Sequence, residues 1–175
     1  MDKKIKKMVL AALFAAITCV STMVIKVPTI GTNGYVNIGD AAVLLSAWLL
    51  GNPYGALAAG IGSGLADILA GYIAYAPGTI IIKFAMAFAG FIIFKLMGKT
   101  SLPKPVAYIA SALVAEMIMV VGYFLYESAL LGYGLAAAAS IPSNMIQGGT
   151  CMILGFVMIE ALSKIPYVKA VVREM

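Results

Sequence analysis

Apolar residues in this chain form long runs separated by short clusters of glycine, proline and polar residues. We distinguish six such runs and predict a membrane-embedded helix for each, over residues 8–25, 39–50, 53–72, 78–96, 105–126 and 142–162. The second run is short, about 18 Å at about 1.5 Å per residue, against a hydrocarbon core of about 30 Å. Whether it crosses the membrane therefore has to be decided from the charges on either side of it.

Most basic residues fall into three clusters at the ends of these runs. Ten of the twelve lysines and arginines lie within residues 3–7, 95–104 and 164–173. Because positive charge is concentrated on the cytoplasmic side of membrane proteins, the first two clusters should both be cytoplasmic, which requires an even number of crossings between them. If the run 39–50 is counted as a membrane span, there are four crossings between these two clusters. We therefore predict an all-α membrane protein with six transmembrane helices and cytoplasmic N- and C-termini, a single domain over residues 1–175.

Composition agrees with membrane insertion and excludes several functions. Hydrophobic residues make up 63% of the chain and charged residues 11%, which is unusual for a soluble domain. Because the net charge of +5 is explained by topology, we expect membrane lipid and not nucleic acid as a partner. The chain has no histidine, and Cys19 and Cys151 lie in apolar runs as small buried hydrophobes. We expect no metal site and no cofactor.

Two long, nearly uncharged loops are predicted on the extracellular side. Residues 27–38 contain Asn33-Gly34 between β-prone residues, which favours a hairpin. Residues 127–141 contain an alanine run at 136–139 that favours a short helix. Loops of this kind can cover a helix bundle as lids. They can equally be ordinary connections, and the sequence leaves both interpretations open.

Polar residues inside the apolar runs gather in the predicted outer half of the bundle. A charge at the centre of a membrane helix costs about 2.5–3.5 kcal/mol on insertion scales, so a chain that keeps one usually uses it. A few polar groups among aromatic and apolar side chains are typical of a small-molecule site. The predicted substrate-binding residues are Asn37, Asp40, Asp67, Tyr72, Tyr75, Lys83, Glu116, Tyr123, Asn144 and Gln147.

Several of these residues have a structural alternative. Asp40 follows a glycine at a helix start, where an N-cap is the simplest role. Asp67 and Lys83 have matching depth on consecutive helices, so Lys83 either pairs with Asp67 or contacts the ligand. Glu116, at mid-membrane depth, either serves function or bonds to a neighbouring helix. Trp48, near the inner boundary, is expected in the aromatic belt at the membrane surface.

Short motifs in the first half of the chain are similar to a known family. They are Val-Asn-Ile-Gly-Asp at 36–40, Gly-Asn-Pro-Tyr-Gly at 51–55, Ala-Asp at 66–67, and Pro-Gly-Thr at 77–79 followed by Lys83. Together with the size, the six runs and the basic termini, they resemble the substrate-binding S component of energy-coupling factor (ECF) vitamin transporters. The resemblance implies a multi-pass protein of the bacterial plasma membrane that binds a water-soluble vitamin or precursor under its outer loops.

The resemblance also implies partners. Small residues at spacing four let helices approach closely, and packing within the protein is their usual role. In the family, an alanine surface on the first helix instead docks on a membrane scaffold subunit, which two cytoplasmic ATPase subunits drive. The corresponding residues here are Ala11, Ala12, Ala15 and Ala16. The chain has no Gly-x-x-x-x-Gly-Lys-Ser/Thr phosphate loop, so we expect a transporter subunit that is not itself an enzyme.

The substrate is expected to be a small heteroaromatic ring with hydroxyl groups. The predicted site mixes one cation with carboxylates, amides and tyrosines, which suits pyridoxine or hydroxymethylpyrimidine best, followed by riboflavin or thiamine. The alternative function is a stand-alone secondary transporter in which Glu116 or Asp67 relays protons. An intramembrane enzyme is disfavoured because, without histidine, the usual metal and Ser-His routes are closed.

Overall fold

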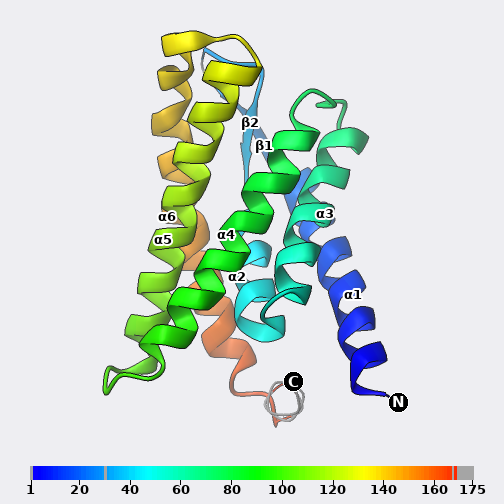
Figure 1. The fold of residues 1–175 in the computed structure, drawn as a ribbon, viewed down its shortest axis with the longest axis vertical. Helices are drawn as coiled ribbons and strands as arrows, with labels where there is room; N and C mark the ends of the chain where they lie inside the picture. Colours follow the sequence, from blue (N-terminus) through cyan, green and yellow to red (C-terminus); the bar gives the residue numbers. More distant parts are fainter. Residues whose placement is uncertain (1, 30, 167, 169–175) are drawn as a thin grey trace.

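The computed structural model describes residues 2–29, 31–166 and 168 as a bundle of helices with one short β-hairpin (Figure 1). The elements in chain order are α1 (Lys3–Val24), β1 (Lys26–Pro28), β2 (Tyr35–Asn37), α2 (Gly39–Leu50), α3 (Tyr54–Leu69), α4 (Ala76–Met97), α5 (Lys104–Leu125), the π-helical turn η1 (Tyr126–Leu130), the 3₁₀ helix η2 (Gly134–Ser140) and α6 (Ile141–Leu162). Each predicted run corresponds to one α-helix, and the second has its predicted bounds.

The short helix α2 forms the centre of the bundle. It contacts α1, α3, α4 and α6, and all of its residues except Leu49 are buried. A helix that is apolar around its whole circumference is stable only when other elements surround it. The run at 39–50 is therefore short because it is enclosed by its neighbours.

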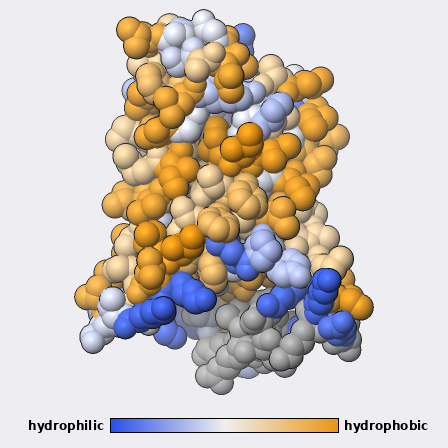
Figure 2. All heavy atoms as spheres, in the orientation of Figure 1, coloured by the Kyte–Doolittle hydropathy of each residue, from blue (hydrophilic) through white to orange (hydrophobic). Residues whose placement is uncertain are grey.

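Four helices among the described residues are long and apolar enough to cross a membrane. They lie within Lys4–Val24, Ala76–Met97, Lys104–Leu130 and Gly134–Leu162, whereas α2 and α3 are shorter apolar helices. The sides of the bundle are largely hydrophobic, and hydrophilic residues gather at the end where α1 begins and α4 passes into α5 (Figure 2). The protein is thus a helical membrane protein. Two predicted cytoplasmic charges, Lys169 and Arg173, lie outside the described residues.

The end of the core nearest these basic residues is apolar and aromatic. Trp48 is only 5% exposed, and its ring lies edge-on to Tyr108 with the centroids 5.0 Å apart. Its Nε1–H donates to Ser111 Oγ over 2.8 Å. The prediction that Trp48 lies in the aromatic belt is wrong, because α2 is central and its last turns face other helices instead of lipid headgroups.

The predicted hairpin is present at the opposite end of the bundle. β1 and β2 are antiparallel, with Val27 opposite Val36. The loop between them meets the second predicted lid loop, because the Asn33 N–H donates to the Tyr133 hydroxyl over 3.2 Å. The alanine run predicted as a short helix lies in η2. The two outer loops therefore contact each other above the helices.

Candidate functional site

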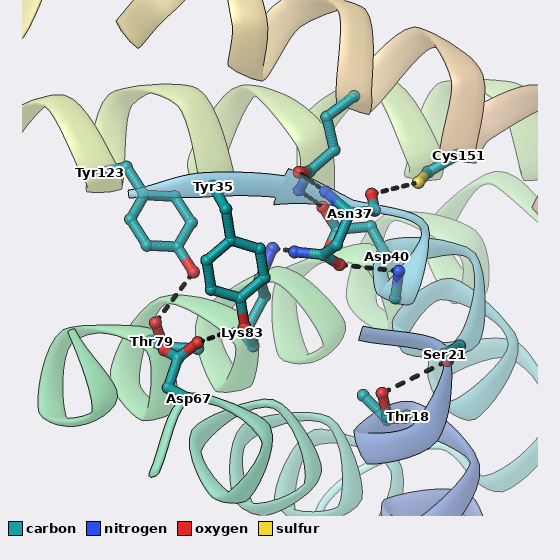
Figure 3. A network of polar contacts seen from close by, with 12 residues as sticks. Thr18, Ser21, Tyr35, Asn37, Asp40, Asp67, Thr79, Lys83, Tyr123 and Cys151 are labelled. Atoms are coloured by element: carbon teal, nitrogen blue, oxygen red, sulfur yellow. Dashed lines mark hydrogen bonds and ion pairs between the residues drawn. The ribbon is translucent and has the colours of Figure 1, made fainter. Parts of the chain in front are cut away.

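A buried ion pair between two helices forms the base of the candidate site. Lys83 of α4 donates to Asp40 of α2, and their side chains are 3% and 1% exposed (Figure 3). The other carboxylate oxygen of Asp40 accepts from the Gln147 amide of α6. Removing charges from water is costly, and such a pair is tolerated when further hydrogen bonds complete it, as the Gln147 amide does here.

This ion pair corrects two predictions. The partner of Lys83 is Asp40 and not Asp67, because α2 starts at the depth of Lys83 and lies against α4. Asp40 does not cap α2 either. The N-cap residue is Ile38, without a side-chain cap, and Asn37 Oδ1 accepts from the Gly39 N–H over 2.8 Å instead. Asn37 satisfies one of the free N–H groups at the helix start, and Asp40 is left for Lys83.

Strand β2 connects the hairpin to the helices at two points. The Tyr35 hydroxyl donates to Asp67 Oδ1 over 2.6 Å, and the Asn37 backbone N–H donates to Gln147 Oε1 over 2.6 Å (Figure 3). Burial, followed by the adjacent Asp67 carboxylate, raises the pKa of Tyr35, so its hydroxyl remains a donor at physiological pH. The hairpin is therefore held closed by two short hydrogen bonds.

Helices α4 and α5 are joined beside the ion pair. The hydroxyls of Thr79 and Tyr123 share a hydrogen bond of 3.0 Å (Figure 3). The ammonium of Lys83 lies 5.2 Å from the centroid of the Tyr123 ring, within the range of a cation–π contact. Tyr123 thus provides an aromatic wall next to the buried cation.

Glu127 belongs to the site although the sequence analysis did not select it. It lies in η1 and is 2% exposed. Its carboxylate accepts from the Tyr75 hydroxyl over 3.1 Å and from the Ser140 hydroxyl over 2.6 Å. Burial, and to a lesser degree Glu127, raises the pKa of Tyr75, so this hydroxyl also stays a donor. Glu127 joins the second loop to the start of α4.

These groups surround a small cavity beneath the hairpin. Its volume is about 20 Å³. Its lining consists of Thr22, Thr29, Gly34, Tyr35, Asn37, Ser63, Asp67, Tyr75, Thr79, Lys83, Tyr123, Glu127 and Asn144. Six of the ten predicted substrate-binding residues are among them. The wall is formed by polar and tyrosine side chains from several elements that are distant in the sequence.

The four other predicted residues lie outside the cavity lining. Asp40 and Gln147 stand behind Lys83 and orient it. The Tyr72 ring contacts the Tyr35 ring at a tilt of 52°, with the centroids 4.5 Å apart, and lies outside the cavity lining. Glu116 of α5 is buried away from the cavity, and neither of its carboxylate oxygens has a hydrogen-bond partner among the described residues.

Sequence periodicity would have found three of the residues that were missed. Tyr35 precedes Asn37 by two residues on a strand, which puts both on one face. Thr79 precedes Lys83 by four residues on a helix, and Glu127 follows Tyr123 by four where η1 continues α5. Each missed residue therefore shares a face with a predicted one.

The predicted docking alanines lie on a separate surface. Ala11, Ala12, Ala15 and Ala16 line a groove of about 680 Å³ between α1 and α3, together with apolar residues such as Leu57 and Ile61. The helices are in close contact beneath it, since a Cβ at Gly62 would lie 2.4 Å from the Ala15 carbonyl oxygen. The face therefore packs internally through its backbone and leaves alanine side chains open to the groove.

Comparison with known proteins establishes the family. The family model of the ECF-type riboflavin transporter S component matches residues 2–164. This chain belongs to that S-component family. The resemblance seen in the sequence motifs is confirmed. An S component is the substrate-specific membrane subunit of a vitamin uptake system, so the protein is a transporter subunit and not an enzyme, and a stand-alone secondary transporter is not favoured.

The chain is also similar to individual proteins. The thiamine precursor transporter HmpT from Lactococcus lactis subsp. cremoris (strain MG1363) is 27% identical over 164 residues, covering 93% of this chain and 88% of HmpT. An uncharacterized protein from Pyrococcus woesei is 31% identical over 137 residues, covering 78% of this chain and 87% of that protein. The solved structure of the S component of a bacterial ECF transporter has a TM-score of 0.67 at 18% identity, covering 92% of this chain and 97% of that one.

Proposed function

We propose that this S component binds a single-ring vitamin precursor, hydroxymethylpyrimidine or pyridoxine, in the cavity beneath the hairpin. The observation that carries the proposal is the buried Lys83–Asp40 pair at the base of a cavity with tyrosine and amide groups in its wall. Hydroxyl and ring-nitrogen groups of such a ligand can hydrogen-bond to these side chains, and Tyr123 can stack on its ring. The name of HmpT, a thiamine precursor transporter, supports this substrate class.

The size of the cavity favours a small ligand over riboflavin. A volume of about 20 Å³ holds little more than one water molecule. Any vitamin must therefore displace the hairpin by breaking the Tyr35–Asp67 and Asn37–Gln147 hydrogen bonds. A one-ring ligand requires less displacement than a three-ring flavin, so we rank riboflavin and thiamine second.

The proposed topology places this opening outside the cell. The hairpin lies at the end of the bundle opposite the basic clusters at residues 3–7 and 95–104, which are expected to face the cytoplasm (Figures 1 and 2). With six crossings and both termini inside, the single domain over residues 1–175 takes its ligand from the outside under the two loops. The scaffold subunit and two ATPase subunits of an ECF transporter then drive its release into the cell.

Ligand identification tests the proposal directly. Small molecules released by denaturing the purified protein are identified by mass spectrometry, and the detergent-solubilised protein is titrated calorimetrically with hydroxymethylpyrimidine, pyridoxine, thiamine and riboflavin. Tight, ATP-independent binding of a one-ring compound is expected. Binding of riboflavin alone would overturn the substrate assignment, and binding of none would overturn the function. Uptake by liposomes that contain only this chain would favour the proton-coupled alternative.

Docking through the alanine face is tested by Ala15→Trp. The indole should fill the groove between α1 and α3, so uptake in cells and co-purification with the scaffold should be lost while ligand affinity is kept. Leu113→Trp is the matched control, because Leu113 is 54% exposed on α5, away from the groove. Preserved uptake in Ala15→Trp would assign this face to internal packing alone.

A further inference from the structure

Two hydroxyl groups in the cavity wall have no hydrogen-bond partner among the residues that the structure describes. Thr22 of α1 is 3% exposed and Ser63 of α3 is 1% exposed, and both line the cavity beneath the hairpin. A buried hydroxyl without a partner is costly, because it gives up its hydrogen bonds to water and gains none in return. Two such groups in the wall of one cavity therefore require an explanation.

The packing of α1 against α3 brings the two hydroxyls to one side of the cavity. The helices lie side by side and both rise from the basic end of the bundle (Figure 1). They touch where a Cβ at Gly62 would lie 2.9 Å from the Thr18 Cβ. Ser63 follows Gly62 on α3, and Thr22 lies one turn beyond Thr18 on α1. The hydroxyls of Thr22 and Ser63 are thus within about one helical turn of each other in depth.

Another part of the cavity wall has groups that the protein itself satisfies. The ammonium of Lys83 is bound by Asp40, and Tyr123 presents its ring to that ammonium. By contrast, the hydroxyls of Thr22 and Ser63 remain available to a ligand in the cavity. The side formed by α1 and α3 is therefore built to recognise a small polar group and not a charge.

The size of the closed cavity indicates which polar group fits. Its volume of about 20 Å³ admits one group of the size of a water molecule. The oxygen of a primary alcohol has this size, and it can donate one hydrogen bond and accept two. The hydroxyls of Thr22 and Ser63 can also donate or accept, so an alcohol satisfies both of them whichever oxygen supplies the proton. A methyl group in the same place would leave both unpaired.

We propose that Thr22 and Ser63 bind the alcohol arm of the ligand. This inference rests on the proposed function and identifies the part of the substrate that the α1–α3 side recognises, a hydroxymethyl group on the ring. The arm enters the space that the closed protein already has, and the ring takes the space that opens when the hairpin moves. Hydroxymethylpyrimidine and pyridoxine both carry such an arm, so the two hydroxyls select for the alcohol and not for the kind of ring.

Ligands that differ only in this alcohol test the inference. The probes are hydroxymethylpyrimidine and pyridoxine, each compared with analogues in which a methyl group replaces one hydroxymethyl group. Calorimetric titration in detergent measures their affinity for the wild type, for Ser63→Ala and for Ser63→Ala combined with Thr22→Ala. In the wild type, loss of the alcohol should weaken binding at least about 30-fold, because buried hydroxyls stay unpaired. In the double variant this ratio should fall to about threefold or less, because the hydroxyls that distinguish the two compounds are gone.

The stability of the ligand-free protein separates recognition from a structural role. Because the Ser63 hydroxyl bonds to no described residue, Ser63→Ala should leave the thermal unfolding temperature without ligand unchanged. The stabilisation by the alcohol ligand should nevertheless decrease. Thr18→Ala is the matched control, since the Thr18 hydroxyl is also buried and without a partner among the described residues but lies outside the cavity lining. It should keep the wild-type preference for the alcohol.

The outcomes distinguish this inference from the function on which it rests. If the wild type binds none of the probes, the proposed function fails and the inference fails with it. If the wild type binds alcohol and methyl compounds equally, or if the double variant keeps the wild-type preference, the inference is overturned while the proposed function stands. If Thr22→Ala prevents folding, Ser63→Ala alone decides. A preference reduced by at least about threefold then supports the role of these hydroxyls, and an unchanged preference overturns it.

Discussion

The half of this bundle beneath the hairpin, which is the outer half in the proposed topology, and the opposite, inner half are built on different physical principles. In the outer half, side chains are joined by polar contacts such as Lys83–Asp40 and Tyr35–Asp67. In the inner half, Trp48, Tyr108 and Phe94 pack as aromatic rings, with the Tyr108 and Phe94 centroids 4.8 Å apart. Trp48 adds a hydrogen bond to Ser111 within this apolar cluster. The outer half is held together by hydrogen bonds and an ion pair, and the inner half is held together by close packing of apolar and aromatic side chains.

This difference separates recognition from support. A hydrogen bond contributes only about 0.5–1.5 kcal/mol net, so a ligand that offers equivalent partners can replace it. A packed apolar core loses stability when the volume of its side chains changes, and it contains few hydrogen bonds that a ligand could replace. Ligand binding should therefore rearrange the hairpin and loop contacts while the base around α2 stays fixed. Substitutions in the two halves should separate affinity from stability.

The largest expected effect is that of Lys83→Ala in the outer half. It leaves the Asp40 carboxylate buried without its cation, which should lower the free energy of unfolding by about 3–5 kcal/mol. It also removes the buried Lys83 ammonium from the cavity wall, so ligand affinity should fall by two orders of magnitude or more, which is about 2.7 kcal/mol. Thermal unfolding in detergent and calorimetric titration measure the two effects.

A double variant tells the two roles of Lys83 apart. Lys83→Met combined with Asp40→Leu removes both charges, and replacing a buried pair by apolar residues of similar volume is often neutral for stability. Stability should return while ligand affinity stays low. If ligand affinity returned together with stability, the ion pair would be a structural element and not part of the site.

A smaller effect is expected when the hairpin is loosened. Tyr35→Phe removes the hydroxyl that donates to Asp67 over 2.6 Å and keeps the ring that contacts Tyr72. Loss of a hydrogen bond to a buried charged acceptor should make ligand dissociation about tenfold faster. Rapid-dilution release of a radiolabelled ligand measures the rate. Tyr54→Phe, which removes a hydroxyl at the start of α3 and outside the cavity lining, is the control, and equal release from wild type and Tyr35→Phe would contradict a lid role.

The helices were predictable because each one is an uninterrupted apolar run. The second run shows this best, since the Gly39 and Gly51 positions gave its bounds directly. Its place was not predictable in the same way. Apolarity around the whole helix indicates burial but not which neighbours enclose it. For this reason Trp48 was assigned to the membrane surface although it lies in the core.

The depth of the site residues in the bundle was predictable from the sequence, but the ion pairs and hydrogen bonds between them were not. Depth along each helix selected Lys83 and Asp67 correctly as members of the cavity wall. It offered Asp67 as the pairing partner of Lys83 where the structure has Asp40, because the pairing depends on how three helices are rotated and on where α2 begins. Glu127 was missed for a related reason. It was assigned to a loop, whereas the π-helical turn η1 carries it back over the cavity.

The smallest expected effect on binding belongs to the inner half. Trp48→Phe removes the Nε1–H that donates to Ser111 and leaves space beside Tyr108, so the free energy of unfolding should fall by about 1–3 kcal/mol. Ser111 keeps a partner, because its hydroxyl also donates to the Tyr108 carbonyl over 2.9 Å. Ligand affinity should stay within about twofold of the wild type, which corresponds to a change of about 0.4 kcal/mol or less in the binding free energy. The reason is that Trp48 lies in the packed inner half and does not line the cavity. Thermal unfolding with and without saturating ligand checks both quantities, because a variant with unchanged affinity shows the same ligand-induced stabilisation as the wild type. A reduced ligand-induced stabilisation in Trp48→Phe would mean that the inner half takes part in recognition, and the division between a supporting and a recognising half would not hold.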